Sequence, residues 1–143
     1  MKLALRQIKP LLGAMRALDG LVENNELKPF VFSSKVTWNK VKNIDILERW
    51  DRKIEKARID RSVQAAGGRD KLMSQEIAQS LNLDWADHLD TEEEIPGLLT
   101  FSEDDLGVYD KSTNPGGNRI PSSVLATLLP FIVLKSDQPP TSP

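Results

Sequence analysis

The amino-acid sequence predicts a mainly α-helical fold of the α+β class, and three observations lead to this prediction. Apolar residues recur at steps of three and four positions in several stretches, as in helices with one buried side. Residues that cap or end helices bound these stretches. Only one short run, near residues 98–110, has the character of a strand. We therefore expect a helical hairpin with a long second helix, a short third helix, a small β element near 98–110 and a short C-terminal helix.

The first helix is predicted within "ALRQIKPLLGAMRALDG". Six apolar residues of this stretch fall on one helical stripe: Leu5, Ile8, Leu11, Leu12, Met15 and Leu18. Pro10 lacks a backbone N–H and is tolerated only in the first turn, so we expect the helix to begin near Gln7 and Met1–Leu5 to be extended. Gly20 is expected to cap the C-terminal end.

A connector and a long second helix follow. Asn24 and Asn25 favour a turn, and Pro29 disfavours helix at the residue before it. Either Ser33 or Ser34 can accept hydrogen bonds from the next N–H groups and cap a helix that runs roughly over residues 35–64.

The apolar residues of this second helix lie on two sides. One side, in the later part of the helix, carries Ile46, Leu47, Trp50, Ile54 and Ala57, and the other carries Trp38, Val41 and Ile44. We therefore expect the helix to be buried on different faces along its length, with Trp50 and Ile54 in the core. Asp45 precedes Arg49 by four positions, a spacing that supports a helix.

The glycine pair at 67–68 breaks the second helix, and helical spacing then resumes. The apolar residues of this short third helix are Leu72, Ile77, Leu81 and Trp85. After the break at Pro96 and Gly97, "LLTFS" predicts a short strand, and "VYDKSTNPGGNRI" is dense in turn-forming residues. A last helix is expected from about Ser122, and Pro130 should kink or end it.

Length and composition indicate a single domain. With 143 residues the chain can bury one core, and we expect residues 1–135 to form a compact domain followed by a flexible Pro/Ser tail at 136–143. The absence of Cys excludes disulfides, thiolate metal sites and thiol nucleophiles. Arg6, Lys9 and Arg16 interrupt the apolar N-terminal stretch, so we expect neither a signal peptide nor a membrane anchor.

Charge is distributed unevenly along the chain, although the formal net charge is only −2. Residues 1–71 contain sixteen Lys or Arg and nine Asp or Glu, whereas residues 72–110 contain eleven acids and no Lys or Arg. Such asymmetry is informative about partners and association rather than about fold.

No motif in the chain predicts catalysis or a bound cofactor. His88 is the only histidine, and with Asp84 it supplies two ligands, whereas a catalytic zinc normally has three from the protein. The consecutive carboxylates at 92–94 are typical of a solvated run, not of the buried acid that general acid–base catalysis needs. The glycine pairs at 67–68 and 116–117 match no phosphate-binding loop. We therefore expect a protein that is not an enzyme and holds no metal or cofactor.

The later part of the second helix also bears on nucleic-acid binding. Its bases are Arg49, Arg52, Lys53, Lys56, Arg58 and Arg61, and its acids are Asp45, Glu48, Asp51, Glu55 and Asp60. The excess of one positive charge is small, and phosphate affinity depends on many uncompensated bases, so the sequence argues against direct binding to nucleic acid.

Five stretches taken together resemble small bacteriophage and prophage proteins: "MKLALRQ", "ALDGL", "LKPF", "ILERWDRKIEKARIDR" and "IPSSVLATLLPFI". The resemblance covers roughly residues 1–132. It implies a charged helical hairpin, an acidic strand region and a short C-terminal helix that starts after a Pro, and it supplies no catalytic residues. It further implies a location in the cytoplasm of the host cell or in the virion.

Small phage proteins of this kind either bind and inhibit a host complex or serve as virion or assembly components. The acidic segment favours the first role, because carboxylates that stand in for phosphates can occupy a basic groove. We expect contacts to a basic protein surface, on a host complex or another phage protein, from Asp84, Asp87, Asp90, Glu92, Glu93, Glu94, Glu103, Asp104 and Asp105. The alternatives are a virion component of the capsid, neck or tail, a metal-dependent or carboxylate enzyme, and a solvated linker without a partner. The sequence does not determine the oligomeric state.

Overall fold

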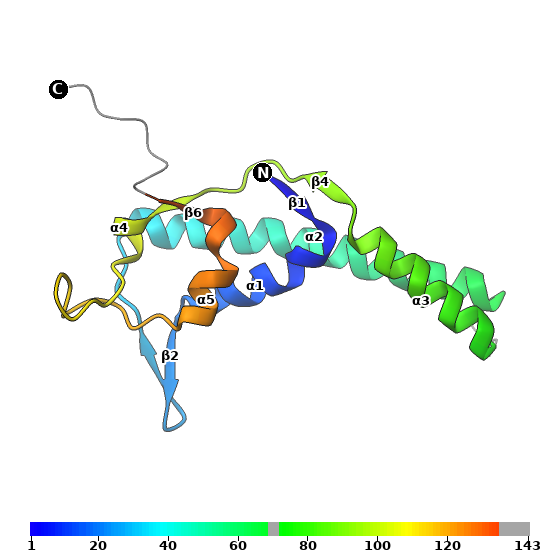
Figure 1. The fold of residues 1–143 in the computed structure, drawn as a ribbon, viewed down its shortest axis with the longest axis horizontal. Helices are drawn as coiled ribbons and strands as arrows, with labels where there is room; N and C mark the ends of the chain where they lie inside the picture. Colours follow the sequence, from blue (N-terminus) through cyan, green and yellow to red (C-terminus); the bar gives the residue numbers. More distant parts are fainter. Residues whose placement is uncertain (69–71, 135–143) are drawn as a thin grey trace.

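The computed structural model describes residues 1–68 and 72–134, and it confirms a mainly α (α+β) fold (Figure 1). The elements in chain order are β1 (Lys2–Ala4), a 3₁₀ turn η1 (Leu5–Gln7), α1 (Ile8–Ala17), β2 (Gly20–Glu23), β3 (Glu26–Pro29), α2 (Ser34–Ala66), α3 (Gln75–Leu89), β4 (Glu92–Glu94), β5 (Phe101–Ser102), α4 (Glu103–Leu106), α5 (Ser122–Thr127), a 3₁₀ turn η2 (Leu129–Phe131) and β6 (Ile132–Val133). The expected tail at 136–143 lies outside the described residues.

Helix α1 is the centre of the hydrophobic core. Its stripe is buried as the spacing predicts, and it packs against α2 on one side and α5 on another (Figure 1). The core also takes in Leu47 of α2, Phe101 of β5 and Phe131 of η2. These buried residues form one continuous cluster, although they come from segments far apart in the chain.

The end of α1 differs from the prediction. Leu18, not Gly20, is the C-cap residue, and Gly20 instead opens β2. A Cβ atom at position 20 would lie 2.4 Å from the carbonyl oxygen of Lys28 in the partner strand, so glycine is required there by the close approach of two backbones.

The connector after α1 is a β-hairpin, which the sequence did not predict. Strands β2 and β3 pair antiparallel, and the turn falls at Asn24 and Asn25 as expected, with φ of 52° and 62°. Positive φ at both central residues gives the turn type whose twist suits a two-residue hairpin. The hairpin projects from the body of the molecule (Figure 1).

Helix α2 confirms the predicted long second helix. The Ser33 hydroxyl accepts a hydrogen bond from the Val36 N–H at 3.2 Å, and Gly67 caps the other end with φ of 80°. Trp50 and Ile54 pack against the core and are half-buried. The prediction that the opposite side is also buried is wrong for Trp38 and Val41, which are 61% and 53% exposed because no element covers that side of α2.

Helix α3 begins at Gln75, with the Ser74 hydroxyl as its N-cap, so Leu72 precedes the helix and is fully exposed instead of lying on its stripe. No residue of α3 is buried. With the distal half of α2 it forms an arm that extends beyond the core (Figure 1). We refer to this part of the molecule, residues 50–66 and 75–89, as the arm.

The expected β element is shorter than predicted and has companions elsewhere. Only Phe101 and Ser102 of "LLTFS" are in a strand, and β5 pairs parallel with β6 at the other end of the sequence. The consecutive glutamates form β4, which pairs antiparallel with β1. The predicted C-terminal helix is present as α5, and Pro130 lies in the 3₁₀ turn that follows it.

Candidate functional site

The structure divides the acidic residues of the expected binding surface between two places. Asp84, Asp87 and Asp90 lie at or near the end of α3, next to β4, whereas Glu103, Asp104 and Asp105 form the start of α4. Figure 1 shows α4 at one end of the molecule and α3 at the other, with an extended segment between them. The nine residues therefore do not form one continuous surface.

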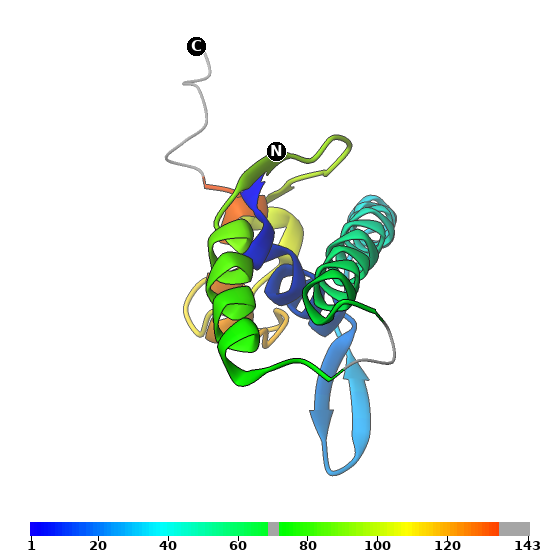
Figure 2. The ribbon, with the colours of Figure 1, turned by 90° about the vertical axis from the view of Figure 1, so that its right-hand side faces the viewer.

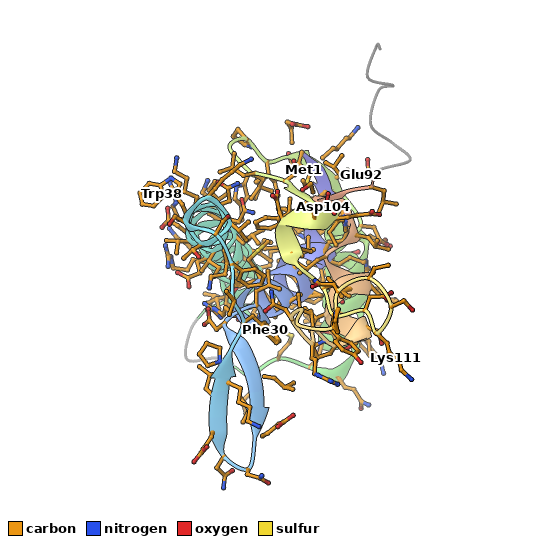
Figure 3. The ribbon with its side chains drawn as sticks, turned by 90° about the vertical axis from the view of Figure 1, so that its left-hand side faces the viewer. Met1, Phe30, Trp38, Glu92, Asp104 and Lys111 are labelled. Atoms are coloured by element: carbon orange, nitrogen blue, oxygen red, sulfur yellow. The ribbon has the colours of Figure 1, made fainter. Side chains whose placement is uncertain are left out.

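The N-terminal segment neutralises several of the carboxylates near β4. The Met1 ammonium group lies 2.6 Å from Oε1 of Glu94, the Lys2 Nζ lies 3.6 Å from Oε2 of Glu92, and Arg6 binds the Asp90 carboxylate. Figure 3 shows Met1 and Glu92 close together at the same edge. These pairs join β1 and η1 to the segment that follows α3, so part of the acidic run serves the fold.

The carboxylates on α4 also have local roles. The Asp105 carboxylate accepts a hydrogen bond from the Ser102 N–H at 2.9 Å, and the Ser102 hydroxyl accepts one from the Asp105 N–H at 3.2 Å. This is a capping box, which satisfies two N–H groups at the start of a helix.

Three of the expected binding residues have no ion-pair partner: among the described residues, Asp84, Asp87 and Glu93 have no cation within 4.0 Å. Their expected role in partner binding stays a prediction.

A cleft of about 590 Å³ opens at the base of the arm, where η1 and α1 meet α2 and α3. In the view along the arm, α2 and α3 lie apart with η1 and the start of α1 between them (Figure 2). The cleft is lined by Leu5, Arg6, Lys9, Pro10, Asp51, Ile54, Glu55, Arg58, Trp85 and Leu89. Half of these residues are apolar and half are charged, a mixture suited to an amphipathic ligand.

The charges of the cleft are held in pairs. The Arg58 Nε donates to Oε1 of Glu55 at 2.9 Å, and this hydrogen bond lowers the pKa of Glu55 and raises the pKa of Arg58. The Lys9 Nζ lies 4.0 Å from Oδ1 of Asp51. Both carboxylates therefore face a cation, and the cleft offers charges of both signs beside apolar side chains.

Trp85 forms the aromatic wall of the cleft. The Arg61 guanidinium lies 5.4 Å from the centre of the Trp85 ring on one side, and the His88 ring is centred 5.1 Å from it. These contacts hold the indole in place although it is only half-buried. His88 thus contacts an aromatic ring, and within residues 1–68 and 72–134 no three His, Asp or Glu side chains come together as metal ligands.

The solvent side of α2 is a second feature, and the charge count along the sequence did not reveal it. Five bases lie at helical spacing on this side: Lys42, Arg49, Arg52, Lys53 and Lys56. Two of the helix acids point elsewhere, since Asp51 faces Lys9 and Glu55 holds Arg58, whereas Glu48 pairs with Arg16 of α1 and also lies 4.0 Å from Arg52. Asp45 and Asp60 have the same spacing as the bases, so this basic face, counted together with Glu48, carries two net positive charges.

No helix in the described part of the chain combines the length and apolar character needed to cross a membrane. Comparison of the chain with protein-family models, curated proteins and solved structures gives no match.

Proposed function

We propose that this protein is a non-enzymatic protein of bacteriophage type that binds a partner protein, and that the partner inserts an amphipathic segment into the cleft at the base of the arm. The observation that carries the proposal is the incomplete burial of α3. No residue of α3 is buried, and Trp85 and Leu89 line the cleft next to Ile54 of α2. A partner helix lying there would cover apolar surface that the chain itself leaves open.

The chemistry of the cleft supports a peptide ligand in particular. Leu5, Pro10 and Ile54 in the lining suit apolar side chains, and the paired charges can bond with polar groups of either sign. The carboxylates of Asp84, Asp87 and Glu93 do not line the cleft, and they remain free to attract a separate basic surface, which accelerates association more than it raises affinity.

A photo-crosslinking amino acid placed at Lys9, which is exposed and lines the cleft, tests this proposal in a bacterial lysate. The same amino acid at Lys111, on a distant loop, is the control. We expect one protein to be cross-linked from position 9 and not from position 111. That protein, once purified, should bind wild type and Trp85→Phe but lose at least tenfold in affinity for Trp85→Ala.

A matched control for the loss of an indole is Trp38→Ala, because Trp38 lies outside the cleft and points away from the body (Figure 3). Equal cross-linking from both positions, or equal affinity for wild type and Trp85→Ala, would contradict the proposal. The alternative role, a virion component, predicts many copies of the protein in purified particles, whereas an inhibitor of a host complex should be absent from them.

A further inference from the structure

The arm presents charges of opposite sign on its two outer sides. The basic face lies on α2, with Arg52, Lys53 and Lys56 exposed. On the outer side of α3, Glu76, Leu83, Asp84 and Asp87 are exposed, and we call these four residues the acidic face. Trp85 points into the cleft toward α2, so Leu83, two positions earlier, points away from it.

Both faces also expose apolar side chains that the fold leaves uncovered. Leu83 is 70% exposed in the middle of the acidic face, and Ile59 is 48% exposed one helical turn beyond Lys56. Trp38 and Val41 are exposed at the other end of the basic face. Apolar side chains together with charges are the composition of a protein–protein contact. A polyanion such as nucleic acid would bind the bases of α2 but would leave the apolar side chains of both faces uncovered.

From this complementarity we infer that the protein associates with itself, the acidic face of one copy docking on the basic face of the next. The partner with a basic surface that the acidic residues predict is thus a second copy of this chain. This inference goes beyond the proposed function, because it uses the outer sides of the arm and leaves the cleft open.

The position of the two faces decides the symmetry of the contact. Figure 2 shows α2 and α3 on opposite sides of the molecule, so one copy can use both faces at the same time. Two basic faces repel each other, as do two acidic faces, which excludes a contact between identical patches. The association is therefore head-to-tail, and such contacts build a ring if they close and a filament if they do not.

The size of the contact sets its strength. Helix α3 has 15 residues and is about 22 Å long, so the acidic face covers much less than a standard interface. A single contact is consequently weak, and exposed charge attraction is screened beyond about 8 Å at physiological salt. We expect association that grows with protein concentration and is lost as salt is added.

Sedimentation velocity of the full chain over a range of concentrations, at low and at high salt, measures this directly. Wild type should exceed its monomer mass of 16.0 kDa at low salt and return to it at high salt. Lys53→Glu/Lys56→Glu should remain monomeric because both of its faces are acidic, and Asp84→Lys/Asp87→Lys should remain monomeric because both are basic. An equimolar mixture of the two variants should associate again, since opposite charges then meet.

Lys28→Glu/Lys111→Glu, which changes the net charge equally but away from the arm, should associate like wild type. The inference is overturned if wild type stays at 16.0 kDa at every concentration and salt, or if the mixed variants do not associate. It is also overturned if monomeric wild type binds a single-stranded oligonucleotide and Lys53→Glu/Lys56→Glu does not, because the basic face then serves a polyanion. Loss of self-association leaves cross-linking at Lys9 unaffected, so the two proposals fail separately.

Discussion

The side-chain amide of Asn43 on α2 pairs with both backbone polar groups of Leu99, 56 residues away. Its Oδ1 accepts a hydrogen bond from the Leu99 N–H at 2.8 Å, and its Nδ2 donates to the Leu99 carbonyl oxygen at 2.8 Å. The Asn118 amide does the same with Val31, 87 residues away, through bonds of 2.8 Å to its N–H and carbonyl. Each buried amide thus replaces a strand partner for a segment that has none.

Replacing Asn43 with Leu should destabilise the fold by about 1–3 kcal/mol, because the N–H and carbonyl of Leu99 lose their partners in a part-buried site. Urea denaturation followed by circular dichroism gives the change in free energy of unfolding. Asn39→Leu, at a half-buried position on the same helix, is the control and should change stability much less. Equal effects of the two substitutions would show that the Asn43–Leu99 pair has no special role.

The core and the arm should respond differently to the same substitution. Leu47 is fully buried, so Leu47→Ala should cost about 2–5 kcal/mol of unfolding free energy. Leu83 is 70% exposed, so Leu83→Ala should stay within about 0.5 kcal/mol of wild type. Thermal unfolding of both variants under high-salt conditions, where the chain is expected to be monomeric, makes the comparison. A large loss from Leu83→Ala in the monomer would place that side chain in the fold and not in a contact.

The stability of the β2–β3 hairpin should depend on how well the residue at each turn position tolerates a positive φ. Asn25 has φ of 62°, so Asn25→Val should weaken the hairpin by about 1–2 kcal/mol, whereas Asn25→Gly should preserve it. Amide hydrogen exchange of residues 20–29 reports on the hairpin itself. Faster exchange in both variants, or in neither, would mean that the turn conformation does not limit hairpin stability.

Asp110 should make part of the stability pH-dependent. Backbone N–H groups of Thr113 and Ser112 donate to its carboxylate at 3.0 and 2.8 Å, and these bonds lower its pKa. A carboxylate with a lowered folded-state pKa stabilises the fold above its unfolded pKa of about 3.9 and loses that contribution as the pH falls through the folded value. Asp110→Ala should therefore be less stable than wild type at pH 7, and the difference should shrink at about pH 3. A constant difference across that range would assign the effect to packing alone.

Much of the helical structure could be predicted because its signals are local. The stripe from Ile8 to Met15, the Ser33 cap and the Gly67 terminus act within a few residues of one another, so periodicity and capping alone locate α1 and α2. The turn at Asn24 and Asn25 was predicted for the same reason. The same local signals say nothing about which strands pair, and β1–β4 and β5–β6 were missed since each joins segments from distant parts of the chain.

At the candidate site, the excess of carboxylates in residues 72–110 and the mixed charges of α2 follow from the amino-acid sequence alone. Which of these charges remain available for a partner depends on the tertiary contacts. Glu92, Glu94 and Asp90 pair with the N-terminal segment, and Asp51 and Glu55 of α2 face the cleft, which leaves the solvent side of α2 basic. Helical spacing sets the direction of a side chain relative to its own helix, whereas its neighbours and its exposure depend on the elements that pack against that helix.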